Sequence, residues 1–99
     1  MYNVQFASKR VKKEFGKLNK QDRGSVEEAL SVLSEDPRPD AYQFSKLNRN
    51  KDVKRIRCKR ARVFYIIDEN SKTVHIGHMD IRNSKSYSAD PKHWFAAVS

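Results

Sequence analysis

The chain has little of several residue types on which binding sites often depend. Its 99 residues include one cysteine, Cys58, and three glycines. A single cysteine excludes an internal disulfide and a cysteine-based metal cage. The glycines, at positions 16, 24 and 77, stand too far apart for a glycine-rich phosphate-binding loop. Any chemistry must therefore come from charged and polar side chains.

Long apolar runs are also missing. No stretch approaches the roughly 20 residues that a membrane-spanning helix needs. Residues 1–13 lack the apolar core of a signal peptide. We therefore expect a soluble cytoplasmic protein with no membrane partner. A chain of this length predicts one domain, residues 1–99, whose site lies on an open face or in a shallow groove.

Acidic residues are outnumbered by basic ones. There are 21 Lys and Arg residues against 12 Asp and Glu, a net charge of +9. Residues 53–99 hold ten of the basic residues and only four of the acidic ones. A basic concentration of this kind favours polyanions, and nucleic acid first. The alternative is a general charge that keeps the protein soluble.

Apolar periodicity predicts an α+β fold of two layers. Residues 2–6 alternate in polarity, which predicts a strand. Two helical stripes follow, and Ser8 and Asn19 are the expected N-caps. Because the connection between them is short, we expect a helical hairpin. Residues 35–40 contain two prolines and end the second helix.

The second half of the chain predicts strands. Residues 41–51 show no period and are expected to form a loop. Strands are expected over 53–58, 62–68 and 73–79, and the short turns between them require an antiparallel meander. The first strand should join this sheet. A short C-terminal helix is expected from Pro91, carrying Trp94, Phe95 and Val98; its aromatic residues either pack on the core or contact a partner.

A basic cluster lies on the first two of these strands. Its six members fall within nine positions, directly before an apolar run: Lys54, Arg55, Arg57, Lys59, Arg60 and Arg62. Strand alternation predicts Arg55, Arg57 and Lys59 on one side, and Lys54, Ile56 and Cys58 on the other. Arg62 should join the first group as a cross-strand neighbour. Three arginines on a rigid face could grip phosphates and stabilise charge on a transferring phosphoryl group. The alternative is a sheet face kept polar for solubility.

Other reactive groups are few. The histidines show no metal-ligand spacing, so we expect no metal site and no cofactor. His78 is a candidate proton carrier, although packing or an RNA contact is the alternative. Asp68, Glu69, Asp80 and Asp90 are expected at turns, which argues against a two-metal nuclease. RNA can be cut without metal when its own 2′-hydroxyl attacks the adjacent phosphate. A tyrosine whose pKa is lowered by neighbouring cations could then help to move protons.

The order of several short motifs resembles the RelE/ParE superfamily of toxins from toxin–antitoxin systems. The resemblance runs along nearly the whole chain and rests on the segments YNVQF (2–6), KEFGKL (13–18), EDPRP (35–39), KL (46–47), RIR (55–57), RVFYIID (62–68) and Gly77, His78, Arg82 and Tyr87. It implies a small α+β fold with a twisted antiparallel sheet. It also implies a cognate antitoxin that wraps and neutralises the toxin.

RelE-type members of this superfamily resemble ribosome-dependent messenger RNA endonucleases. For this chain the resemblance implies a metal-independent endoribonuclease that acts on mRNA in the A site of the 70S ribosome. It carries catalytic roles onto Arg55, Arg57, Arg62, Arg82 and Tyr87. His78 is a further catalytic candidate, and the expected RNA-binding residues are Lys54, Lys59, Arg60 and Lys85.

The sequence departs from the RelE pattern in two places. Ungapped counting back from Tyr87 places Ile81, not Arg82, at the later arginine position. The basic pair at 55 and 57 is arginine rather than lysine, which removes an easily deprotonated amine. Two other functions stay open: a ParE-type inhibitor of DNA gyrase that acts by protein contact, and a non-toxic RNA-binding relative.

Overall fold

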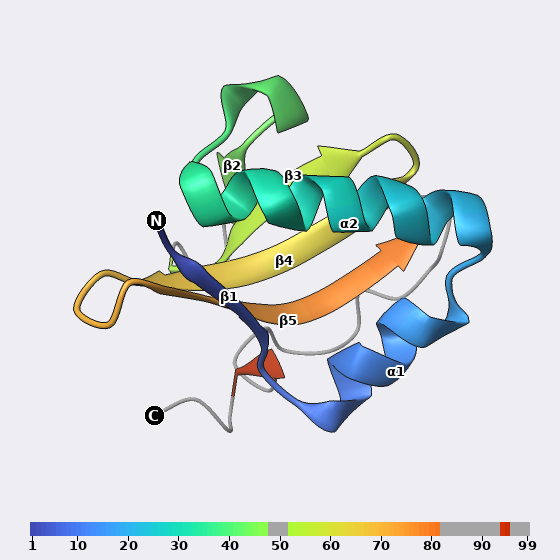
Figure 1. Cartoon of the computed structure of the whole chain (residues 1–99), viewed down its shortest axis with the longest axis horizontal. Coiled ribbons are helices and arrows are strands. Elements are labelled where there is room, and N and C mark those ends of the chain that lie inside the picture. Colours follow the sequence, from blue (N-terminus) through green and yellow to red (C-terminus); the bar gives the residue numbers. More distant parts are fainter. Residues whose placement is uncertain (48–51, 82–93, 96–99) are drawn as a thin grey trace.

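The computed structural model describes residues 1–47, 52–81 and 94–95, and it shows a five-stranded sheet covered on one face by two helices (Figure 1). In chain order the elements are β1 (Asn3–Phe6), α1 (Lys9–Lys17), α2 (Lys20–Glu35), the 3-10 helix η1 (Asp40–Tyr42), β2 (Ser45–Lys46), β3 (Lys54–Cys58), β4 (Ala61–Asp68) and β5 (Thr73–Ile81). The strands lie in the order β1-β5-β4-β3-β2. β1 runs parallel to β5, and the other neighbouring strands are antiparallel. The predicted α+β class and meander are confirmed.

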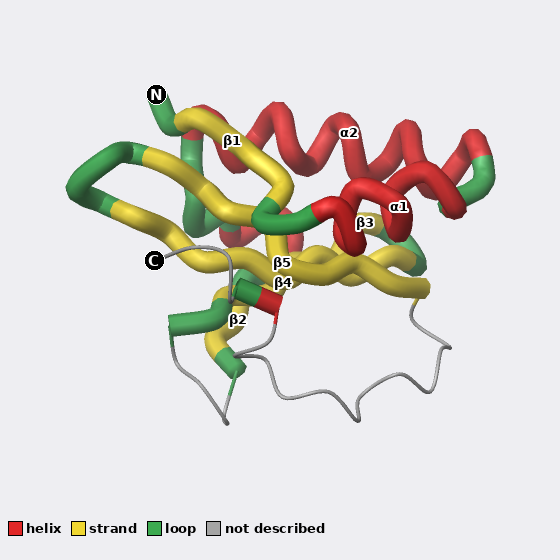
Figure 2. Tube along the Cα trace, turned by 90° about the horizontal axis from the view of Figure 1, so that it is seen from below, coloured by secondary structure: helices red, strands yellow, loops and turns green. Residues whose placement is uncertain are grey.

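The two helices begin at the predicted caps. The Ser8 side chain accepts a hydrogen bond from the Val11 N–H at 3.5 Å, and Asn19 accepts one from the Asp22 N–H at 2.8 Å. Both helices lie on the same side of the sheet (Figure 2). No helix in the described part of the chain is long and apolar enough to cross a membrane.

The main core lies between the helices and the sheet. Val11 of α1 and Leu33 of α2 are fully buried against Ile56 of β3 and Ile76 of β5. Tyr65 is also fully buried, and its hydroxyl donates to the Pro37 carbonyl at 2.7 Å. Val74 and Ile76 of β5 are fully buried in this core. This core makes the helix-covered face of the sheet unavailable to a ligand.

The segment expected to be a loop contributes a strand. Ser45 and Lys46 pair with Arg55 and Lys54, so β2 forms the edge of the sheet beside β3. Gln43 has a left-handed backbone (φ 56°) that separates η1 from β2. A strand of two residues is too short to show a polarity period, which is why the sequence did not reveal it.

A β-bulge at Gly77 changes which side chains face away from the helices. Phe64 pairs with His78, but Tyr65 pairs with Ile76, so Gly77 has no partner on β4. Strict alternation would place Ile76, His78 and Asp80 on one face. Because of the extra residue, Ile76 faces the helices whereas His78 and Asp80 face the opposite side.

A second apolar cluster lies on that opposite side. Val53, Phe64, Trp94 and Phe95 are buried together, and Leu47 and Ile66 pack against them. Trp94 and Phe95 thus pack against the sheet, which is the first of the two alternatives left open by the sequence. Trp94 is helical and Phe95 lies in a turn, whereas the remaining residues of the expected C-terminal helix, including Pro91 and Val98, lie outside the described residues.

Gly77 and Gly24 give a matched pair of stability predictions. A Cβ at Gly77 would collide with the Phe95 ring, so Gly77→Ala should destabilise the protein by about 1–3 kcal/mol and shift Trp94 fluorescence to longer wavelength. A Cβ on the helical Gly24 meets nothing within 4 Å, so Gly24→Ala should stabilise by up to about 1 kcal/mol. Urea unfolding followed by fluorescence measures both. Equal effects of the two substitutions would contradict the placement of Phe95.

Candidate active site

The sheet face away from α1 and α2 carries the candidate site, which we call the arginine face: Arg55, Arg57, Arg62, His78 and Asp80. Arg57 of β3 pairs with Arg62 of β4, which pairs in turn with Asp80 of β5. Arg55 lies in the neighbouring row with Phe64 and His78. Directly paired residues point to the same side of a sheet. The structure therefore brings together the predicted Arg55, Arg57, Arg62 and His78.

Arg62 is held in a two-pronged ion pair with Asp80. The Arg62 Nε donates to Asp80 Oδ1 at 2.8 Å, and Nη2 donates to Oδ2 at 3.1 Å. Both residues are more than nine-tenths buried. Burial alone would raise the pKa of Asp80, but hydrogen bonds from His78 and Arg62 hold that pKa below its usual value. The expectation that Asp80 lies at a turn is wrong, because β5 continues to Ile81.

His78 lies between two carboxylates. Its Nδ1 is 2.9 Å from Glu14 Oε2 of α1, and its Nε2 is 3.3 Å from Asp80 Oδ2. Burial lowers the pKa of His78, but the two carboxylates together raise it above its usual value. The imidazolium can then donate to both carboxylates. With both ring nitrogens engaged, His78 is not presented as a free proton carrier.

Trp94 covers His78 on the arginine face. The two rings stack with centroids 4.6 Å apart and an interplanar angle of 16°. Trp94 also contacts Phe64, with centroids 5.0 Å apart. An indole face over a charged imidazole is a favourable cation–π arrangement. The tail residue thus shields the His78 network from solvent.

Helix α1 reaches this network along the edge of β5. β1 pairs with β5 only as far as Ile76. Beyond that point Arg10 Nη2 donates to the Gly77 carbonyl at 2.7 Å, and Glu14 Oε1 accepts from the Met79 N–H at 3.1 Å. Side chains of α1 therefore replace the missing strand. Neither Arg10 nor Glu14 was a predicted site residue, since nothing in the sequence relates them to β5.

The two β3 arginines differ from Arg62 in their surroundings. Arg57 is half-buried and makes no side-chain hydrogen bond or ion pair to any residue in 1–47, 52–81 or 94–95. The Arg55 Nε is buried without a hydrogen-bond partner, as is the hydroxyl of Ser45, its paired residue on β2. Positive charge beside Arg62 is thus left for an anionic ligand to balance.

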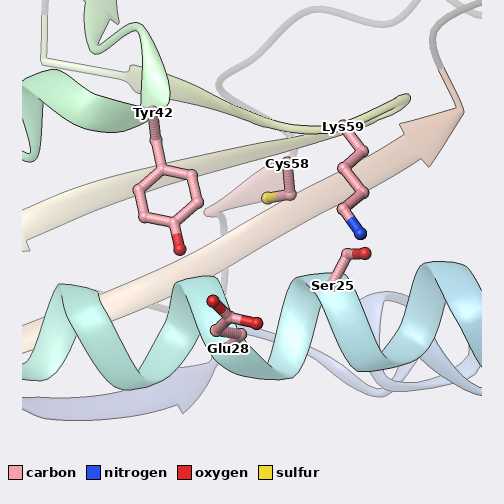
Figure 3. A pocket seen from close by; sticks show the side chains of 5 residues that line it. All are labelled: Ser25, Glu28, Tyr42, Cys58 and Lys59. Atoms are coloured by element: carbon pink, nitrogen blue, oxygen red, sulfur yellow. The ribbon is translucent and has the colours of Figure 1, made fainter.

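Lys59 and Arg60 do not lie on the arginine face, and the prediction that Lys59 shares a side with Arg55 and Arg57 is wrong. Lys59 has φ 58°, so strand alternation ends before it. Its side chain extends toward Ser25 of α2, beside a small cavity of about 60 Å³ (Figure 3). Arg60 forms an ion pair with Asp22 of α2 at 2.8 Å. The side chains of both residues therefore lie beside α2, on the helix-covered side of the sheet.

The same cavity is lined by Cys58, Glu28 and Tyr42 (Figure 3). Burial raises the pKa of the Cys58 thiol to about 12, which leaves it a poor nucleophile. A cavity of about 60 Å³ is too small for a nucleotide. It offers no competing active site.

Lys54, another predicted residue, lies away from the network. Lys54 is on β3 at the end away from the Lys59 turn, and its ammonium donates to the Asp52 carbonyl at 3.1 Å. Partial burial lowers the pKa of Lys54. Arg82, Lys85 and Tyr87 lie outside the described residues, and their roles stay predictions.

No protein-family model and no curated protein sequence matches the chain. Solved structures with the same fold do match it. The chain superposes on RelE in the archaeal RelE–RelB complex of Pyrococcus horikoshii with a TM-score of 0.72 and 26% identity, covering 83% of this chain and 96% of that one. It matches the Mycobacterium tuberculosis RelBE2 complex with a TM-score of 0.70 and 26% identity, covering 82% and 98%. The chain has the RelE fold.

The isolated Escherichia coli RelE toxin shares this fold at 23% identity, with a TM-score of 0.71 over 87% of this chain and 89% of that one. The resemblance to RelE-type toxins seen in the sequence is therefore confirmed, and the ParE type is not favoured. The arginine face, defined by the paired Arg57, Arg62 and Asp80, lies opposite α1 and α2, which share the other side of the sheet (Figure 2).

The network predicts a pH-dependent contribution to stability. His78 has a raised pKa, so its contribution is complete below its unfolded value of 6.5 and is lost as pH rises through the higher folded value. Glu14 and Asp80 have lowered pKa values, so their contributions are present above 4.5 and 3.8 and are lost as pH falls through the lower folded values.

Urea unfolding of the wild type and His78→Gln should therefore differ most between roughly pH 5 and pH 6.5, and less on either side. The stacking of Trp94 on His78 supplies a second probe, because it can be followed by near-ultraviolet circular dichroism. A difference that grows steadily above pH 7 would contradict the charged state of His78.

Proposed function

We propose that this RelE-like protein is the toxin of a toxin–antitoxin system and cuts messenger RNA in the A site of the 70S ribosome. The matched chain from Mycobacterium tuberculosis comes from the RelBE2 toxin–antitoxin complex, and the matched chain from Pyrococcus horikoshii comes from a RelE–RelB complex. Both support the toxin role and an antitoxin partner. The observation that carries the nuclease proposal is the row of Arg57 beside Arg62 on the sheet face opposite α1 and α2.

The reaction assigned to this face needs no metal. The 2′-hydroxyl of one nucleotide attacks the adjacent phosphorus, and the bond to the 5′-oxygen of the next nucleotide breaks. The products are a 2′,3′-cyclic phosphate and a 5′-hydroxyl end. The protein must orient the strand, balance the extra charge on the pentacoordinate phosphate, and allow one proton to leave and another to arrive.

The arginines suit the first two tasks. A guanidinium can donate two parallel hydrogen bonds to a phosphate. Arg57, which is not paired with a carboxylate in the described residues, and Arg55 beside it are assigned to bind the scissile phosphate. Arg62 is assigned to stabilise the transition state, because it lies directly across from Arg57.

Proton transfer is assigned to a group other than His78, whose ring nitrogens both face carboxylates. Tyr87 is the candidate that the family resemblance supplies, with Arg82 and Lys85 nearby in the sequence. On this proposal His78 acts by holding neighbouring side chains in place. Lys54 is assigned to attract RNA from solution at longer range.

Arg57→Ala is the sharpest test of the nuclease proposal. The substitution removes no ion pair to the described residues, so the fold should persist, while the cleavage rate on programmed ribosomes should fall about 100- to 1,000-fold. Arg60→Ala is the control for loss of an arginine away from the arginine face, because its guanidinium pairs with Asp22 on the helix side. Urea unfolding of both variants separates a loss of stability from a loss of cleavage. Wild-type cleavage by Arg57→Ala, with 5′ ends mapped by primer extension, would refute the assignment.

Pulse labelling after induction separates this proposal from the gyrase and RNA-binding alternatives. Amino-acid incorporation should stop before thymidine incorporation, because translation is the first process affected. Coexpression of the antitoxin should restore growth. If DNA synthesis stops first, the gyrase alternative is correct; salt-sensitive RNA binding without any cleavage would indicate a non-toxic RNA-binding protein.

A further inference from the structure

A continuous chain of charged groups joins helix α1 to Arg62. It starts at Glu14, passes through His78 at 2.9 Å and Asp80 at 3.3 Å, and ends at Arg62. The His78 side chain is 10% exposed, and those of Asp80 and Arg62 are 8% and 10% exposed. Solvent therefore screens these contacts little, and each group depends on its neighbours for charge balance.

We propose that Glu14 and His78 are positioning residues for Arg62: through Asp80 they fix the direction of the guanidinium beside Arg57. This inference rests on the proposed nuclease function for its catalytic consequence. Its structural part concerns the free protein and can be measured without any substrate.

The division of Asp80 between two donors carries the argument. Asp80 Oδ2 is shared by His78 Nε2 at 3.3 Å and Arg62 Nη2 at 3.1 Å, whereas Oδ1 receives Arg62 Nε at the shorter distance of 2.8 Å. His78 thus limits how strongly Asp80 holds the outer edge of the guanidinium. Without a charged His78, we expect Asp80 to hold both prongs of Arg62 equally and to compete better with a phosphate.

Glu14 is needed to keep His78 charged. From α1, Arg10 Nη1 lies 3.4 Å from His78 Nδ1 and opposes a positive ring, while Glu14 favours it. From the sheet, Asp80 favours the charged ring and the nearby Arg62 opposes it. Trp94 stacks on the ring and keeps water away. With two cations and two anions around it, His78 depends on each carboxylate for its charge.

Glu14 can be changed without removing its scaffold contact. Its Oε1 accepts the Met79 N–H at 3.1 Å, and the amide oxygen of glutamine can accept the same bond. Glu14→Gln therefore removes the charge while α1 stays attached to β5. Glu69→Gln is the matched control: Glu69 also pairs with an arginine, Arg38, but lies exposed at the β4–β5 turn.

The structural part is tested by NMR on the free full-length proteins. In Glu14→Gln, the ring protons of His78 should titrate at lower pH than in the wild type. The Arg62 Nε proton should exchange with solvent roughly 2- to 30-fold more slowly, because Asp80 then holds the guanidinium more tightly; this is the range found along coupled side-chain networks. Glu69→Gln should leave both signals unchanged. If the His78 titration and the Arg62 Nε exchange rate in Glu14→Gln are the same as in the wild type, the proposal is overturned.

The catalytic part is tested by single-turnover cleavage on programmed ribosomes across pH. Glu14→Gln should lower the maximal single-turnover rate roughly 2- to 30-fold near neutral pH and leave the half-saturating ribosome concentration unchanged. The deficit should shrink as pH is lowered, because acid restores the charge on His78. A deficit independent of pH, or none, would overturn the proposal. If the wild type itself cuts nothing, the proposed function fails, while the NMR result still decides whether Glu14 positions Arg62.

Discussion

The buried ion pair between Arg62 and Asp80 is the interaction on which the candidate site depends. A buried pair of this kind adds little net stability, because removing two charges from water offsets most of their attraction. Its effect is geometric: two prongs at 2.8 and 3.1 Å fix the guanidinium and link β4 to β5 at one row of the sheet. Asp80 in turn contacts His78, and His78 contacts Glu14. One constraint thus extends from the arginine face to helix α1.

That arrangement is possible because β5 changes direction at Gly77. The extra residue turns His78 and Asp80 away from the core that holds Val74 and Ile76. The same residue leaves a carbonyl for Arg10, and its lack of a Cβ admits the Phe95 ring. A glycine at a bulge is a common way to re-aim side chains beside a site. β5, α1 and Phe95 therefore meet at the β-bulge formed by Gly77.

The sequence predicted the elements better than the site. Caps at Ser8 and Asn19, the turn after Cys58 and the Arg57–Arg62 row follow from local patterns, and the structure confirms them. Alternation failed where the backbone leaves regular geometry, at Lys59 and at Gly77. It also placed Asp80 at a turn, because the last two residues of β5 continue past the apolar run. The contact of Glu14 with His78 could not be predicted, because 64 residues separate the two and no local period connects them.

The site shows how adjacent guanidiniums can be kept together before a substrate arrives. Arg57 and Arg62 occupy the same row and repel one another, a cost that increases as water is excluded. Asp80 neutralises one of the two, and the half-buried Arg57 keeps access to solvent ions. On the proposed function, an RNA phosphate would take over part of the role of Asp80 as the counter-charge. Asp80 must then bind Arg62 strongly enough to orient the guanidinium, and weakly enough for a phosphate to compete for it. A charged His78 meets both conditions, because it contacts the same Oδ2 atom that accepts from Arg62 Nη2.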